Sequence, residues 1–190
     1  MIMLKHIPNW LTMSRIALIP FVLVAMYFES SVFGHRFAAV LFLYACITDF
    51  FDGYLARMWN VQSRIGRFLD PIADKLLVAS VMVMLVYYGR ADLFPAIAII
   101  TREILVSGLR EFLAEIKVSM PVSALGKYKT FVQMTAIFVL ILGKEGSGID
   151  YTDILGSMIL WVAAGLTVLS GYIYFKASYK YLLGRNENNG

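Results

Sequence analysis

Residues 49–57 read Asp-Phe-Phe-Asp-Gly-Tyr-Leu-Ala-Arg, and residues 66–74, which follow after eight further positions, read Gly-Arg-Phe-Leu-Asp-Pro-Ile-Ala-Asp. Long apolar runs flank this stretch, so its aspartates stand at the end of one predicted helix and at the start of the next. Within each block the two aspartates lie three or four positions apart, which places them on one helix face. We expect a helical hairpin that brings the two pairs together.

The composition indicates a membrane protein. Of the 190 residues, 59% are hydrophobic and 16% are charged, whereas soluble chains are roughly 45–50% apolar and about 25% charged. The 13 Phe, 11 Tyr and 3 Trp exclude intrinsic disorder, and the single cysteine, Cys46, excludes a disulfide scaffold. The chain therefore carries more apolar surface than one soluble core can bury.

The apolar runs predict an all-α integral membrane protein, because a helix needs about 20 apolar residues to cross the hydrocarbon of a bilayer. Six transmembrane helices in one bundle are expected, at residues 11–28, 37–56, 68–88, 93–115, 125–142 and 154–175. No repeat or linker separates them, so residues 1–190 are expected to form a single domain.

The basic residues predict the orientation. When the loops are assigned alternately to two sides, only Arg36, Arg90 and Lys144 of the 17 Lys and Arg fall on one side. The positive-inside rule makes the other side cytoplasmic. Both termini and the motif of residues 49–74 are then cytoplasmic, in a multi-pass protein of the cell membrane. The basic clusters alternate with apolar runs, which favours lipid head groups and phosphates as partners and not nucleic acid.

The four aspartates predict a metal site. Like charges in a partly dehydrated place repel one another unless cations neutralise them. Carboxylate oxygens suit Mg2+ or Mn2+, and two such ions about 3.5 to 4 Å apart are usual for phosphoryl chemistry. The small residues Gly53, Ala56 and Gly66 would let a ligand approach the helix backbones, and Arg57 offers a fork for a phosphate.

The whole pattern, Asp-x-x-Asp-Gly-x-x-Ala-Arg, eight residues, Gly-x-x-x-Asp-x-x-x-Asp, resembles the signature of the CDP-alcohol phosphotransferases at every position. The resemblance implies a membrane-embedded, homodimeric enzyme that moves a phosphatidyl or similar group from a CDP-linked donor to an alcohol and releases CMP. It implies two divalent cations, Mg2+ or Mn2+, and Asp74 as the catalytic base. The implied metal ligands are Asp49, Asp52, Asp70 and Asp74, and the implied CDP-diacylglycerol contacts are Gly53, Ala56, Arg57 and Gly66.

Three further stretches resemble the family members whose acceptor is glycerol 3-phosphate. They are residues 7–15, 102–104 and 126–130. With the 49–74 motif, they extend the resemblance over most of the chain and imply CDP-diacylglycerol and glycerol 3-phosphate as the substrates.

The charges of the predicted fourth helix favour a phosphorylated acceptor independently. At 100° per residue Glu103 and Arg110 lie about 20° apart, and Arg102 falls on the same side. Together with the lysines that open the fifth helix they predict a basic pocket for a phosphate monoester. The predicted acceptor phosphate-binding residues are Arg102, Arg110, Lys127 and Lys129. The alternative for these residues is a structural salt-bridge network with lipid-facing lysines.

Two other functions are consistent with the aspartates. A family member directed to cardiolipin or to an inositol phosphate would share the motif and differ in the acceptor it consumes. A cation-coupled transporter would also use intramembrane carboxylates, but near the middle of the bilayer and not at its cytoplasmic end.

Overall fold

A computed structural model describes residues 7–28, 31–58, 64–118 and 124–182. Within these ranges the side chains are described except at positions 7–12, 50–58, 64–68, 70, 71, 124, 180 and 182. The described residues form helices and no strand. The helices are α1 (Ile7–Tyr27), α2 (Val32–Met58), α3 (Arg64–Tyr87), α4 (Leu93–Glu115), α5 (Ala124–Ser147) and α6 (Thr152–Leu182).

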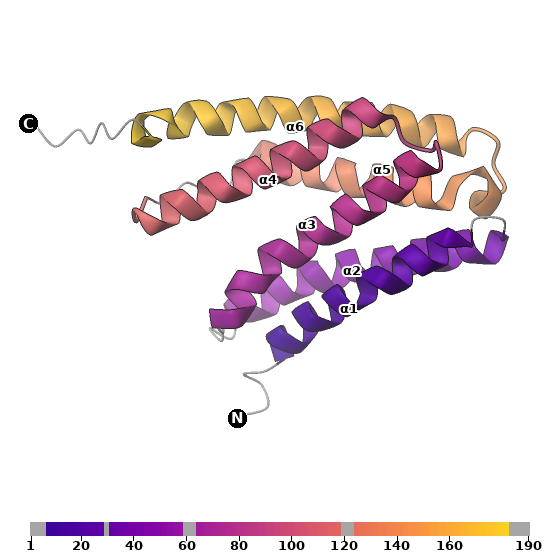
Figure 1. Cartoon of the computed structure of the whole chain (residues 1–190), viewed down its shortest axis with the longest axis horizontal. Coiled ribbons are helices and arrows are strands. Elements are labelled where there is room, and N and C mark those ends of the chain that lie inside the picture. The colour runs from indigo at the N-terminus through magenta and orange to yellow at the C-terminus, as the bar shows by residue number, and fades with distance from the viewer. Residues whose placement is uncertain (1–6, 29–30, 59–63, 119–123, 183–190) are drawn as a thin grey trace, which may run out of the picture.

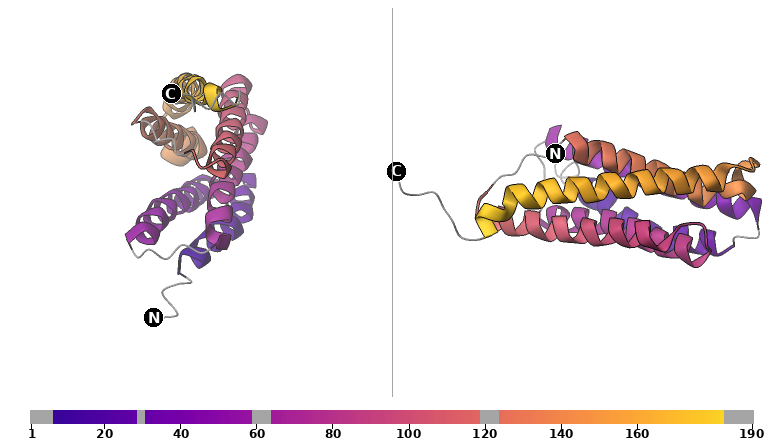
Figure 2. Two further views of the ribbon diagram at one scale, coloured as in Figure 1. Left: turned by 90° about the vertical axis from the view of Figure 1, so that its left-hand side faces the viewer. Right: turned by 90° about the horizontal axis from the view of Figure 1, so that it is seen from above.

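The helices run alongside one another and alternate in direction (Figure 1). The beginnings of α1, α3 and α5 and the ends of α2, α4 and α6 therefore lie at one end of the bundle, on the left in Figure 1, which we call the motif end. The view from above in Figure 2 shows the same alternation.

The helices of the motif, α2 and α3, are joined mainly through a third helix. Among the described residues α1 packs against both α2 and α3, whereas α2 and α3 have at most marginal backbone contact with each other. On the other side, α5 packs against α2 and α6, and α4 packs against α6 and α3. Helix α1, and to a lesser extent α5, therefore connects the two helices that carry the motif.

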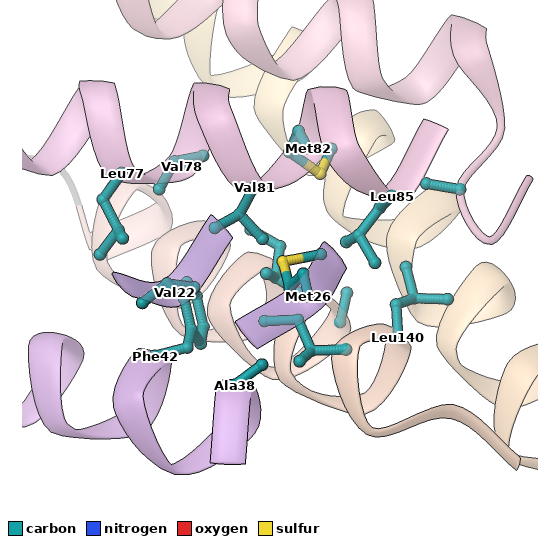
Figure 3. Close-up of a cluster of buried hydrophobic side chains, with 14 of the residues drawn as sticks. Val22, Met26, Ala38, Phe42, Leu77, Val78, Val81, Met82, Leu85 and Leu140 are labelled. Carbon is teal, nitrogen blue, oxygen red and sulfur yellow. The ribbon is translucent and has the colours of Figure 1, made fainter. Parts of the chain in front are cut away.

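The core consists of apolar side chains from all six helices, and Figure 3 shows the part in which α1, α2, α3 and α5 meet. Val22, Phe42, Val81 and Leu140 are fully buried there, and small residues such as Ala38 allow the helices to approach closely. Many large apolar side chains on the outer surface are exposed, as expected where lipid replaces water.

Three helices are long and apolar enough to cross a membrane. Within the described residues the qualifying stretches are Val32–Asp49, Leu125–Ser147 and Thr152–Tyr179, and α1 contributes a shorter apolar stretch, Met13–Tyr27. The all-helical membrane fold predicted from the sequence is confirmed, while membrane crossing by α1, α3 and α4 stays a prediction.

The helix bounds differ from the predicted spans mainly at polar ends. Helix α4 matches its predicted bounds, but α2 begins at Val32 instead of residue 37, and α6 continues to Leu182 instead of ending at residue 175. Hydropathy marks the hydrocarbon thickness, and a helix does not have to end where the hydrocarbon ends.

Candidate active site

The aspartates lie near the end of α2 and near the start of α3, as predicted. Helix α2 continues past the first aspartate pair to Met58, and α3 begins at Arg64, before the second pair. Both helices extend a few residues beyond the predicted spans. Side-chain positions are described for Asp49 and Asp74. The other motif residues that were assigned roles, whose side chains lie outside the described ones, are Asp52, Gly53, Ala56, Arg57, Gly66 and Asp70.

Asp49 is held by a buried arginine of α1. The Nη1 atom of Arg15 lies 2.8 Å from Oδ1 of Asp49. The Arg15 side chain is 1% exposed, while the Asp49 side chain is 46% exposed. The arginine thus contacts the carboxylate from the protein interior and leaves its outer part accessible.

Asp74 of α3 faces the same region as Asp49 of α2. Asp74 interacts electrostatically with Arg15, Lys75 and Lys129. Cys46, one helical turn before Asp49, interacts electrostatically with both carboxylates. One aspartate of each pair, Asp49 of α2 and Asp74 of α3, therefore lies near Arg15.

The donor atoms fit a hard divalent cation. Helical spacing predicts Asp52 on the face of Asp49, and Asp70 on the face of Asp74. Carboxylate oxygens are the donors that Mg2+ and Mn2+ prefer. Among the described side chains there is no group of three or more His, Cys, Asp or Glu in metal-binding proximity. The predicted set of four carboxylates includes Asp52 and Asp70, whose side chains are not described.

A buried charged cluster joins α4, α5 and α6 beside Asp74. Glu103 accepts hydrogen bonds from Lys129 and from Nη1 of Arg102, the latter at 3.3 Å. Arg102 also donates from Nη2 to the hydroxyl of Ser170 at 3.0 Å. Its Nε atom is buried and has no hydrogen-bond partner among the described residues. Arg102 thus retains one donor that no described residue uses.

The remaining cations lie around this cluster. Arg110 is exposed, and its guanidinium lies 5.2 Å from the ring centre of Tyr174. Lys75 interacts electrostatically with Arg110 and with Asp74. Lys75 thus lies between Arg110 and the predicted base Asp74, and Arg110 is not enclosed in the bundle, contrary to the prediction. Lys127 is exposed on α5.

The sequence predicted no part in the site for Arg15, Lys75, Ser170 or Tyr174. The signal for Arg15 was present, since an arginine inside an apolar run of a membrane helix is costly and usually has a partner or a function. Ser170 carries no comparable signal, because a hydroxyl in a membrane helix often bonds only to its own backbone, as Ser170 also does to Thr167.

A second polar cluster lies at the opposite end of the bundle. Arg90 bonds to Glu145 at 3.0 Å and approaches both ring nitrogens of the buried His35. A cavity of about 710 Å3 opens beside Arg90 and Glu145. Nearby, the ion pair of Lys144 with Asp150, at 2.7 Å, holds the pKa of that exposed aspartate below its ordinary value. This cluster is remote from the motif and joins helix ends on that side.

An all-helical membrane protein with carboxylates and basic side chains close together at one end is typical of membrane enzymes that act on phosphorylated substrates. The CDP-alcohol phosphatidyltransferase family matches residues 5–169, and the chain belongs to this family. The family membership predicted from the 49–74 motif is confirmed.

Relatives align over nearly their full length. A protein of Rickettsia felis is 54% identical over 93% of this chain and 97% of its own, and one of Pectobacterium atrosepticum is 41% identical over 91% and 94%. A protein of Rickettsia typhi is 53% identical over 94% and 99%. All three are named CDP-diacylglycerol--glycerol-3-phosphate 3-phosphatidyltransferase.

Proposed function

We propose that this chain transfers the phosphatidyl group of CDP-diacylglycerol to sn-glycerol 3-phosphate, forming phosphatidylglycerophosphate and CMP in phospholipid biosynthesis. The observation that carries the proposal is the 54% identity, over almost the whole of both chains, to a relative named for this reaction. The position of basic side chains beside Asp74 supports a phosphorylated acceptor.

In the proposed mechanism the acceptor's 1-hydroxyl attacks the phosphorus on the diacylglycerol side of the pyrophosphate. A bond forms between that oxygen and phosphorus, the bond from phosphorus to the bridging oxygen breaks, and CMP leaves with the bonding electrons. Asp74 takes the hydroxyl proton. Asp49, Asp52, Asp70 and Asp74 would hold two divalent cations, which when bound neutralise the carboxylates and the pyrophosphate. Gly53, Ala56, Arg57 and Gly66 would contact the CDP end of the donor.

The acceptor side is assigned to the charged cluster of α4 and α5. Arg102, Arg110, Lys127 and Lys129 would bind the phosphate of glycerol 3-phosphate. The buried Arg102 Nε atom, which lacks a partner among the described residues, supports this assignment because buried donors usually have an acceptor. Since Lys129 is already paired with Glu103, we assign Lys129 to orienting the cluster as well as to binding.

The proposed environment is the cell membrane, with the active site and both termini on the cytoplasmic side and a second copy forming a homodimer. The support for the orientation is the distribution of Lys and Arg in the loops. Reporter tags placed before Trp10 and after Arg185 should both report the cytoplasm. Termini on opposite sides would contradict the orientation.

Analysis of the lipid products distinguishes the proposed reaction from the reactions of other family members. Purified protein in detergent would be given CDP-diacylglycerol together with glycerol 3-phosphate, an inositol phosphate and phosphatidylglycerol in equal amounts. We expect phosphatidylglycerophosphate as the main lipid product by mass spectrometry. Cardiolipin or a phosphorylated phosphatidylinositol as the main product would overturn the assignment of the acceptor. Family membership already speaks against the transporter interpretation.

A further inference from the structure

Arg15 lies where α1, α2 and α3 come together. It is almost completely buried and forms an ion pair of 2.8 Å with Asp49 of α2, and it interacts electrostatically with Asp74 of α3. A charge at this depth in an apolar helix is costly unless paired, so the pairing accounts for its presence. The need for an ion pair does not by itself explain why the partner of Arg15 is Asp49, a residue of the 49–74 motif.

Arg15 belongs to the helix that packs against both α2 and α3. Among the described residues α2 and α3 have at most marginal backbone contact, and both pack against α1. The separation of Asp49 and Asp74 therefore depends in part on how α2 and α3 pack against α1. Arg15 of α1 forms an ion pair with Asp49 and interacts electrostatically with Asp74, so it can constrain that separation.

Arg15 contacts Asp49 from one side, and the Asp49 side chain remains partly exposed. Arg15 contacts Oδ1, and the Asp49 side chain remains 46% exposed. A guanidinium offers several donors in a rigid plane and fixes the orientation of a carboxylate better than a flexible ammonium does. Arg15 thus holds one oxygen of Asp49 from the protein interior, while nearly half of the side chain stays exposed.

We propose that Arg15 is a positioning residue for the carboxylate site, which holds Asp49 in orientation and keeps the aspartates of α2 and α3 at a fixed separation. This inference rests on the proposed function, since it takes Asp49 to be a metal ligand. Partners that orient metal ligands typically change metal affinity by about 10- to 100-fold when removed.

The test measures Mn2+ binding to the purified full chain without substrates, by the EPR signal of free Mn2+, alongside thermal unfolding. We expect Arg15→Gln to weaken Mn2+ binding by about 10- to 100-fold. Arg15→Lys, which keeps the charge and loses the planar fork, should weaken it by at least roughly threefold. The matched control is Arg36→Gln, because Arg36 binds the Gly146 carbonyl at the opposite end and should leave Mn2+ binding unchanged.

Asp49→Asn separates this inference from the proposed function. If Asp49→Asn binds Mn2+ like the unmodified protein, the proposed metal site itself is wrong. If Asp49→Asn weakens binding but folded Arg15→Gln does not, or binds more tightly, the positioning role is overturned and Arg15 is a structural or competing cation. Should Arg15→Gln fail to fold, Arg15→Lys decides: binding equal to that of Arg36→Gln overturns the proposal.

Discussion

Glu103 of α4 and Lys129 of α5 form an ion pair in which both side chains are largely buried, at 19% and 3% exposure. The pair joins two helices that are adjacent to the predicted base, and Arg102 shares the same carboxylate. Removing one member leaves the other as an uncompensated buried charge. The pair is therefore both a structural link between helices and the framework of the proposed acceptor site.

Glu103→Gln should destabilise the fold by about 3–5 kcal/mol, because Lys129 loses its carboxylate partner. Adding Lys129→Gln to this variant should restore part of the stability, since the buried ammonium is then absent. Thermal unfolding in one detergent measures both effects. Glu111→Gln is the control, because Glu111 is exposed on the same helix. Equal unfolding of Glu103→Gln and Glu111→Gln would show that the pair contributes nothing.

Arg110→Gln and Lys127→Gln should raise the KM for glycerol 3-phosphate roughly tenfold or more, since a charge-assisted hydrogen bond contributes about 1.5–3 kcal/mol. The KM for CDP-diacylglycerol should hardly change. Arg57→Gln should show the opposite pattern, and Lys176→Gln, an exposed lysine of α6, should change neither constant. An unaltered KM for both substrates in folded Arg110→Gln would favour a structural role for its contact with Tyr174.

Asp74→Asn should lower kcat by about 10^2- to 10^4-fold, as expected when a general base is removed. Asp70→Asn should act mainly by weakening metal binding, so its activity should recover in part at high Mn2+ while that of Asp74→Asn should not. Metal titrations of steady-state activity distinguish the two. Full turnover of the unmodified protein in excess chelator would show that the reaction does not require a metal.

Gly143→Ala should destabilise the fold by about 1–3 kcal/mol. Gly143 interrupts the helical geometry of α5 with a φ of 56°, and a Cβ there would lie 2.6 Å from Nη1 of Arg90. The comparison is Gly108→Ala in α4, where a Cβ meets nothing within 4 Å and helix propensity predicts a gain of up to about 1 kcal/mol. Similar unfolding temperatures for both variants would contradict this role of Gly143.

The sequence allows the helical membrane fold and the family to be predicted because both depend on local patterns. Apolar runs of nearly constant length indicate the helices, and the spacing of the aspartates indicates the motif. Helix ends are less predictable: α2 and α3 extend beyond the apolar runs because polar turns remain helical outside the hydrocarbon.

The contacts between distant helices lie beyond such patterns. Nothing in the spacing shows that Arg15 pairs with Asp49, or that Lys129 pairs with Glu103, since these contacts depend on how α1 and α5 are rotated and packed. The 100° spacing along α4 predicts that Arg102 and Glu103 lie in the interior, and the structure places them there. Arg110 is less buried than this spacing predicts, because its long side chain extends to the exposed surface beside Tyr174.

The most direct test of the central claim is the release of CMP from CDP-diacylglycerol by purified protein, measured with and without glycerol 3-phosphate in the presence of Mg2+ or Mn2+. The proposed reaction predicts rapid CMP release that requires glycerol 3-phosphate, equals the phosphatidylglycerophosphate formed and is lost in Asp74→Asn. CMP release that is independent of glycerol 3-phosphate, or no release under any of these conditions, would contradict the account.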